Sequence, residues 1–287
     1  FVKILGEDGS ETDNPNSFSS KSISVKSLIT VAGVAMNFIL GALLLIIGFN
    51  IGLPQMLNEE NEALAKNIQI QIVAINNNSP AEIAGLKVGD SLINFREISD
   101  LQIFINENKG KEITLEVKRG KETVLSKVTP RVNPPPEEGA IGVALAKTGV
   151  VSYPWYQSIW LGLKSSVIML WEILKGFFGL IKNLIIEREV PQGVSGPVGI
   201  AVLTGQAVNL GFVYLIQLVA LISLNLAVLN LIPFPALDGG RLLFLGIEKI
   251  KGSKVNPKIE NAIHSVGIVL LLALVALITY RDILKLL

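Results

Sequence analysis

The sequence predicts an α-helical multi-pass membrane core with an inserted, extracytoplasmic, β-rich α+β domain. Half of its 287 residues are hydrophobic and its mean hydropathy is +0.53, values that are rare in soluble proteins and typical of integral membrane proteins. Three apolar runs are long enough to cross a bilayer, which requires about 20 residues. A charged stretch with short apolar segments, typical of strands, follows the first run.

Charge and cysteine content exclude several classes of protein. The net charge is only +1, which argues against nucleic acid as a partner. The chain has no cysteine, so disulfides, thiol catalysis and cysteine metal ligands are excluded. It begins at Phe1 rather than Met and shows no signal-peptide pattern. We therefore expect a fragment or a processed product.

The first elements are a polar loop over 1–27 and a transmembrane helix over 28–53. In this helix Gly33 and Gly41 are small residues of the kind that allow close helix–helix approach. Asn37 lies between them and needs a hydrogen-bonding partner if it is buried in a membrane. A simple packing helix with one polar contact is the alternative.

The inserted domain is expected over 59–133, with strands at 68–75, 91–95, 113–117 and 123–128. Ser79-Pro80 marks the start of a short helix between the first two strands, because proline fits a first helical turn. Gly85 ends that helix. Gly89-Asp90 then forms the turn into the next strand.

Two further segments follow the domain. Residues 134–152 open with three consecutive prolines, which predict a stiff linker. Residues 153–186 are apolar but contain three lysines, one glutamate and three tryptophans. Aromatic rings prefer the membrane interface and lysines can extend from it, so we expect an amphipathic helix on the outer membrane surface. An additional transmembrane helix is the alternative.

The remaining elements are a loop plus transmembrane helix over 187–240, a loop over 241–261 and a last transmembrane helix over 262–280. The basic residues of the loop and its border are Arg241, Lys249, Lys251, Lys254 and Lys258. Because basic residues beside spans favour the cytoplasm, this loop is predicted to be cytoplasmic. Alternation then places the inserted domain outside and Asp238 near the cytoplasmic face.

The most informative segment is Asn-Leu-Ile-Pro-Phe-Pro-Ala-Leu-Asp-Gly-Gly at 230–240. A carboxylate at membrane depth costs about 2.5–3.5 kcal/mol on insertion scales, so Asp238 needs a partner or a function. Pro233 and Pro235 cannot continue a helix, and non-helical backbone at that depth must be buried in protein or line a cavity. An ordinary Asp-Gly turn at the end of a helix is the alternative.

The pattern NxxPxPxLDGG at 230–240 resembles the third-ligand motif of RseP-like site-2 proteases, which are intramembrane zinc metalloproteases. In that family the aspartate completes a site otherwise built on an HExxH helix, so the resemblance implies Asp238 as a ligand of Zn2+. The chain contains no HExxH and one histidine, His264, which is either a ligand or a polar interfacial residue. The missing ligands and the catalytic glutamate are therefore expected upstream of Phe1.

Other segments carry the same resemblance: FVKILGED at 1–8, GxxxN at 33–37, GAIGV at 139–143 and SGPVGIA at 195–201. The family implies that Asn230 and Asn37 contact the substrate or the developing oxyanion. It implies that Pro233, Pro235 and Gly33 bind the substrate. The implied activity is cleavage of single-span membrane proteins, such as anti-sigma factors or leftover signal peptides, in the bacterial inner membrane, with this fragment alone inactive.

The segment SPAEIAGLKVGDSL at 79–92 resembles the signature of bacterial PDZ domains. Its signature residues are Ser79, Pro80, Gly85, Gly89 and Asp90. Such domains bind extended peptides or chain termini by strand addition, although a domain that only blocks access is the alternative. The sequence departs from the family at Phe95-Arg96, where Asn-Gly is common.

Two other functional classes remain open. The first is a catalytically inactive membrane adaptor, which predicts that the full-length gene also lacks HExxH. The second is a transporter with a broken helix and a carboxylate at the membrane midplane. A transporter of this kind predicts internal repeats, and the sequence shows none.

Overall fold

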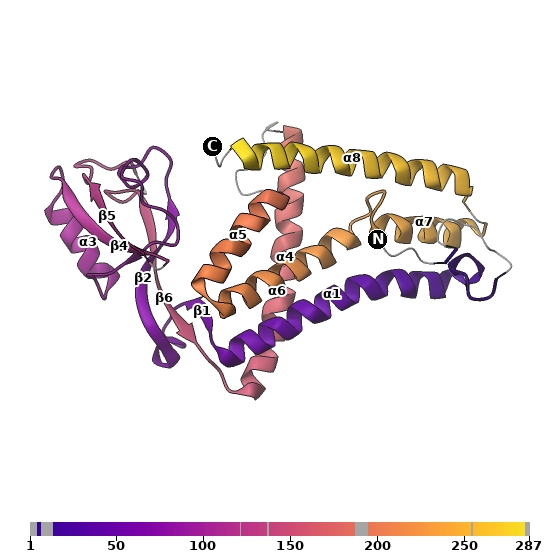
Figure 1. Cartoon of the computed structure of the whole chain (residues 1–287), viewed down its shortest axis with the longest axis horizontal. Helices are drawn as coiled ribbons and strands as arrows, with labels where there is room; N and C mark the ends of the chain where they lie inside the picture. The colour runs from indigo at the N-terminus through magenta and orange to yellow at the C-terminus, as the bar shows by residue number, and fades with distance from the viewer. Residues whose placement is uncertain are drawn as a thin grey trace. The chain divides into compact units, whose positions relative to one another are not determined.

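The computed structural model describes residues 5–6, 14–120, 122–136, 138–186, 195–253 and 255–284 (Figure 1). Most of the FVKILGED segment, and residues 193–194, lie outside the described residues. The chain divides into two compact units. The first comprises 1–46, 160–205 and 216–287, and the second comprises 47–159 and 206–215. The two units are described separately.

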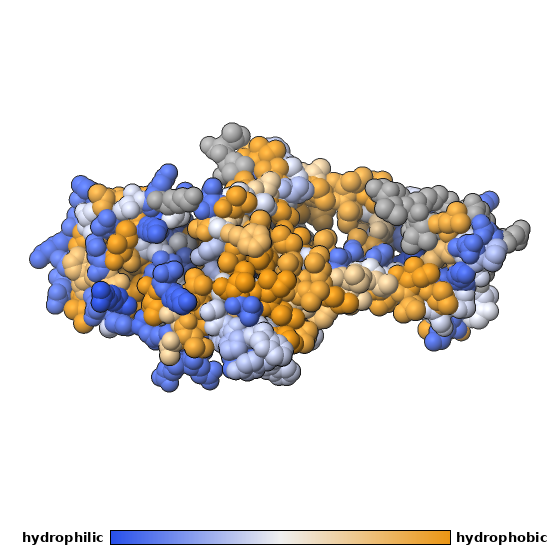
Figure 2. Space-filling model, turned by 60° about the horizontal axis from the view of Figure 1, so that its bottom comes forward, coloured by the Kyte–Doolittle hydropathy of each residue, from blue (hydrophilic) through white to orange (hydrophobic). Residues whose placement is uncertain are grey.

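Three helices of the described chain are long and apolar enough to cross a membrane: α1 (Ile23–Ile51), α6 (Phe212–Leu231) and α8 (Pro257–Leu284). They correspond to the three predicted spans. Only 6% of the most apolar part of α8 is buried inside the protein, against 33% for α6, so α8 exposes most of its apolar surface. Figure 2 shows hydrophobic residues gathered over the helices, as expected for surfaces that contact lipid.

The helix α4 (Trp155–Ile186) runs without interruption through the segment predicted to be amphipathic. It is not one of the three span-like helices, because charged side chains interrupt its apolar sequence. Its placement on or across the membrane stays a prediction. The segment 187–240 contains two helices rather than one, α5 (Pro197–Leu210) and α6. Gly211, at φ +127°, separates them in a backbone conformation that side chains disfavour.

The structure corrects the expected loop over 241–261. Most of this range belongs to α7 (Asp238–Lys251), and α8 already begins at Pro257. The basic residues suggested a loop, but apolar residues recur among them at helical spacing. Leu245 is buried on one side of α7, while Lys249 and Lys251 are exposed. This arrangement makes α7 an amphipathic helix.

The second unit is built on one antiparallel sheet with the strand order β1-β6-β2-β3-β4-β5. Its strands are β1 (Leu53–Met56), β2 (Ala65–Ile75), β3 (Ser91–Leu92), β4 (Ile113–Arg119), β5 (Glu122–Val128) and β6 (Val143–Val151). Its helices are η2 (Glu62–Leu64), α2 (Pro80–Ile83) and α3 (Ile98–Glu107). An apolar helical core and a separate sheet were both predicted, and both are confirmed.

The bounds of the sheet differ from the prediction at both ends. Strand β6 lies inside the range 134–152 that was expected to be a linker, and β1 precedes the predicted start at 59. Both pair over long sequence separations: Val143 lies opposite Ile75, and Leu53 lies opposite Val151. Local patterning does not reveal such pairing, because strand stability depends on distant partners. Helix α3 was also not predicted.

The short helix α2 begins as the sequence predicts. Ser79 is its N-cap, and its hydroxyl accepts a hydrogen bond from Glu82 N at 3.2 Å. Gly85 follows the helix at φ +74°, a conformation that favours glycine. The core beside it is apolar and closed, with Ile70, Ile72, Leu101, Leu115 and Val117 at most 1% exposed.

Asp90 is a buried anchor of this unit as well as a turn residue. Its side chain is 1% exposed and accepts hydrogen bonds from Arg119 Nε and Nη2, both at 2.7 Å. The backbone N–H of Lys87 donates to the same carboxylate at 2.9 Å. The hydrogen bond to Asp90 raises the pKa of the Arg119 guanidinium, which strengthens its hold on its proton.

Candidate active site at the junction of two helices

Helix α6 ends at Leu231 and α7 begins at Asp238, and the six residues between them are not helical. Pro233 and Pro235 have no N–H to donate to a continuing helix. The break is held by its own turns, in which Phe234 N donates to Ile232 O at 2.7 Å and Leu237 N donates to Phe234 O at 3.1 Å. The predicted break is therefore present. Asp238, expected on irregular backbone, is instead the first residue of α7.

Helix α8 fixes the proline-containing loop from the side. The backbone N–H of Ala236 donates to His264 Nδ1 at 3.0 Å, so Nδ1 acts as an acceptor. The His264 ring lies 5.6 Å from the ring of Phe244. A side chain at Gly267 would overlap the backbone of Pro235. The role of His264 was missed, because no local pattern links it to a loop 28 residues earlier.

The two glycines of the motif permit close backbone packing. Both Gly239 and Gly240 are buried in the first turn of α7. A Cβ atom at Gly239 would overlap the carbonyl groups of Leu231 and Ile232, and one at Gly240 would overlap the carbonyl of Phe234. The start of α7 therefore packs directly against the end of α6, which leaves no room for side chains.

Small residues of α1 lie at this junction. A Cβ atom at Gly33 would lie 3.7 Å from Asp238 Oδ2, so the two predicted site residues are neighbours. Further along α1, a Cβ at Gly41 would lie 2.8 Å from Leu224 of α6. Asn37 lies one turn from Gly33 and on the same face of α1. The face of α1 that contains Gly33, Asn37 and Gly41 therefore packs towards α6 and Asp238.

The two predicted amide side chains are half-buried and belong to different helices. Asn37 is on α1, and Asn230 is in the last turn of α6. Among the described residues neither side chain has a hydrogen-bond partner, whereas the nearby Asn225 donates to Leu221 O at 2.9 Å. A half-buried amide without a protein partner is available to bond another polar group.

The described residues do not complete a metal site. A zinc ion needs three protein ligands and an open position for chemistry. The part of the chain that the structure describes contains no cluster of three histidine, cysteine, aspartate or glutamate side chains that could hold a metal. Asp238 offers one carboxylate. His264 is the only histidine, and its Nδ1 is occupied by Ala236.

A second candidate site lies at an open edge of the sheet. Strand β6 pairs with β2 over its whole length, but β1 covers its other edge only from Thr148 to Val151. The edge over 143–146 pairs with no described strand, and α3 lies against β6. In the turn before this edge, the backbone N–H groups of Ala140 and Ile141 have no acceptor among the described residues.

Three ion pairs lie close to this edge. Lys147 Nζ bonds the carboxylates of Glu62 and of Glu97, the latter at 2.9 Å. The hydrogen bond to Glu62 raises the pKa of the Lys147 ammonium most, and the hydrogen bond to Glu97 raises it further. Arg131 pairs with Glu138 at 3.0 Å just before the Gly139–Gly142 turn. These contacts fix both ends of the turn and of the open edge.

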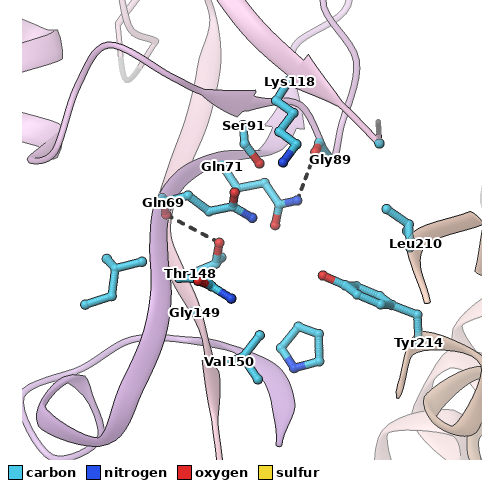
Figure 3. A pocket seen from close by; sticks show the side chains of 14 residues that line it. Gln69, Gln71, Gly89, Ser91, Lys118, Thr148, Gly149, Val150, Leu210 and Tyr214 are labelled. Carbon is cyan, nitrogen blue, oxygen red and sulfur yellow. Dashed lines mark hydrogen bonds between the residues drawn. The ribbon is translucent and has the colours of Figure 1, made fainter. Parts of the chain in front are cut away.

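A pocket of about 650 Å³ lies on the polar face of the sheet, opposite the face that packs against the apolar core (Figure 3). Gln69 and Gln71 line it, whereas Ile70 between them points into the core, as strand alternation requires. Thr148 donates to Gln69 O at 3.4 Å, and the Tyr214 hydroxyl points into the space. Of the predicted site residues it contains only Gly89, so it is distinct from both candidate sites.

Three apolar helices with a carboxylate at a proline-broken junction define a multi-pass membrane protein. The profile of peptidase family M50 matches residues 1–274, and the chain belongs to this family, the site-2 proteases. It is 35% identical over 282 residues to the zinc metalloprotease RasP of Shouchella clausii, covering 94% of this chain and 62% of that protein. The resemblance to site-2 proteases that the sequence motifs indicate is thereby confirmed.

Other relatives agree with this assignment. The regulator of sigma-W protease RasP of Bacillus subtilis is 32% identical over 295 residues, covering 100% of this chain and 65% of that protein. A putative zinc metalloprotease of Clostridium acetobutylicum is 30% identical over 294 residues, covering 99% of this chain and 79% of that protein. The chain thus spans less than two thirds of the length of these two RasP proteins.

Proposed function

We propose that this chain is part of an intramembrane zinc metalloendopeptidase in which Asp238 is one of the zinc ligands. The supporting observation is the position of Asp238, half-buried at a helix junction beside Gly33 of an apolar helix. A carboxylate among apolar helices is costly and marks a functional site by default. The names of the relatives, which are zinc metalloproteases, support the same assignment.

The proposal requires ligands that these 287 residues do not contain. The two histidines and the glutamate of an HExxH helix would come from another part of the protein, so this chain alone is proposed to be inactive. When bound, zinc supplies a water with a pKa near 7 and polarises the scissile carbonyl. The role of this chain is to hold the Asp238 carboxylate in place through the glycine packing and the His264 hydrogen bond.

The substrate is proposed to unwind and bind as an extended strand beside the loop at 232–237. A helical substrate has its carbonyl groups occupied, so it must open before hydrolysis. Asn37 and Asn230 provide amide donors for the substrate backbone or for the developing oxyanion. Gly33 leaves space beside Asp238. The loop around Pro233 and Pro235 offers backbone that is not committed to a helix.

The proposed location is the bacterial inner membrane, with Asp238 near the cytoplasmic face and the sheet domain outside. The basic residues around α7 support this orientation. The proposed substrates are single-span membrane proteins such as anti-sigma factors or leftover signal peptides. The Bacillus subtilis relative is named a regulator of sigma-W protease, which is in keeping with a substrate of the first kind.

The test uses the full-length protein reconstituted with a single-span reporter. Asp238→Asn is expected to abolish cleavage and to lower the zinc content, with an unchanged helical circular-dichroism spectrum. Asp100→Asn is the matched control, because Asp100 is exposed on α3 and loses the same charge. Cleavage by Asp238→Asn at the wild-type rate would exclude Asp238 as a ligand. A wild-type protein with neither zinc nor cleavage would favour the inactive adaptor.

We further propose that the sheet domain is a PDZ domain that binds a peptide or chain terminus at the open edge of β6. An added strand would pair with residues 143–146, and alternate side chains would pack towards α3. The backbone N–H groups of Ala140 and Ile141 would bind a terminal carboxylate. Their lack of an acceptor among the described residues supports this role.

Peptide chemistry tests this binding mode without altering the protein. A peptide with a free carboxyl terminus is expected to bind the whole protein at least about tenfold more tightly than its amide, because a charge-assisted hydrogen bond contributes about 1.5–3 kcal/mol. N-methylation of the peptide backbone should prevent strand pairing. Equal binding of acid and amide would exclude the carboxylate role. Absence of all peptide binding would favour a domain that only restricts access.

A further inference from the structure

A basic pocket lies between the start of α1 and the end of α7. It has a volume of about 300 Å³, and all of its lining residues belong to the helical unit. It is lined by Lys21 and Ser22 just before α1, by Lys26 in the first turn of α1, by Lys249 in the last turn of α7 and by Ser253 just after α7. Two chain segments that are remote in the sequence therefore bring their lysines to one cavity.

The lining is positively charged and contains hydroxyl donors. Three lysines against one glutamate, Glu248, leave two net positive charges. Glu248 is 9% exposed, and its Oε1 accepts a hydrogen bond from Val255 N at 2.8 Å, so that oxygen is engaged in holding the loop after α7. Among the described residues, Lys21, Lys26 and Lys249 form no ion pair.

A buried aromatic ring positions one of these lysines. Lys26 Nζ lies 5.7 Å from the centre of the Phe18 ring, and Arg241 Cζ lies 5.5 Å from it. Phe18 is 7% exposed, so the two cations stack on a ring that cannot easily move. This contact places the Lys26 ammonium before any ligand arrives, which lowers the entropy cost of binding.

The pocket also lies at the membrane boundary. Lys26 is the last charged residue before the apolar run of α1, and no charged residue follows until Glu59. Helix α7 exposes Leu243, Ile247 and Ile250 at 50%, 41% and 91%, although it is too short to span. A short amphipathic helix with exposed apolar residues and lysines lies in the membrane interface. The lysines are therefore at the level of lipid headgroups.

We propose that this pocket binds the phosphate group of an anionic phospholipid headgroup. The lysines provide charge, Ser22 and Ser253 provide hydroxyl donors, and the exposed apolar side chains of α7 lie along the acyl chains. Basic pockets between membrane helices bind phospholipid headgroups by the same chemistry. A bound lipid would join the start of α1 to the end of α7, whose first residue is Asp238.

The test is native mass spectrometry of the full-length protein in neutral detergent, titrated with phosphatidylglycerol or phosphatidylcholine of identical acyl chains. Phosphatidylglycerol is expected to bind more tightly, and equal binding of the two lipids would overturn the proposal. Replacing Lys21, Lys26 and Lys249 together with glutamine is expected to weaken phosphatidylglycerol binding about 100-fold. This corresponds to about fivefold for each lysine near an anionic headgroup.

The matched control replaces Lys164, Lys182 and Lys258 with glutamine, which removes the same charge outside the pocket. It should change binding less than about fivefold, and equal losses in the two triple variants would overturn the pocket. Replacing the three pocket lysines with arginine should retain binding, which separates lost charge from lost fold. Displacement of the lipid by inorganic phosphate at the concentration of the lipid itself would assign a free-phosphate site and overturn the lipid.

Discussion

The carboxylate of Asp282 caps the start of α5, and its removal should loosen that helix. The backbone N–H groups of Gly196 and Gly199 both donate to Asp282 Oδ2 at 2.8 Å. Asp282 is 5% exposed, so solvent cannot replace it easily. A hydrogen bond to a charged group contributes about 1.5–3 kcal/mol, and two such bonds give about 3–6 kcal/mol for Asp282→Ala.

The assay is hydrogen–deuterium exchange of the backbone amides over residues 195–200 in detergent. A loss of about 3–6 kcal/mol corresponds to exchange that is about 140-fold to 20,000-fold faster at Gly196 and Gly199. Asp282→Asn keeps an oxygen acceptor without the charge. Because a neutral hydrogen bond is about half as strong as a charge-assisted one, this variant should accelerate exchange by roughly the square root of the factor expected for Asp282→Ala. Asp100→Ala is the exposed control. Unchanged exchange at both glycines in Asp282→Ala would refute the capping role.

Three further outcomes are expected from thermal unfolding. Gly239→Ala should destabilise the protein by about 1–3 kcal/mol, because the added methyl group would overlap the end of α6. Its control is Gly246→Ala, which lies in open space on the same helix and should stabilise the protein by up to about 1 kcal/mol. Equal effects of the two substitutions would contradict the packing argument. Arg119→Ala should cost about 2–4 kcal/mol, because it leaves the buried Asp90 carboxylate without its cation, and a change below about 0.5 kcal/mol would show that the pair contributes little. The pKa of Lys147 is raised in the folded protein, so the stability that its ion pairs contribute is present below its ordinary pKa of 10.5 and is lost as pH rises through the higher folded pKa. The difference in melting temperature between wild type and Lys147→Met should therefore disappear only above the folded pKa. Its disappearance near neutral pH would contradict a role for the Lys147 ion pairs.

Several elements were predicted because their cause is local. The apolar runs that become α1, α6 and α8 depend on composition alone, since a span requires only length and hydropathy. The break before Asp238 follows from two prolines that cannot donate to a helix. The start of α2 at Ser79-Pro80 follows from capping chemistry within four residues. Each of these signals is confined to a few neighbouring residues.

Other elements could not be predicted because their stabilising contacts are distant. Strand β6 lies in a segment that was predicted to be a linker, because its partner β2 lies 68 to 86 residues earlier in the chain. Helix α7 was not predicted, because its lysines suggested a polar loop. Its buried Leu245 packs within the helical unit. Nothing in the sequence around Gly196 and Gly199 indicates that their N–H groups bond a residue as remote as Asp282.

The amino-acid sequence alone predicts the class of protein, the number of span-like helices in the described chain and Asp238 as a candidate ligand. Those properties follow from hydropathy, proline spacing and a motif, all readable along a single segment. Only the tertiary structure placed Gly33 beside Asp238, joined His264 to Ala236 and gathered three lysines from α1 and α7 into one pocket. Such contacts arise from packing between helices, which local sequence does not specify.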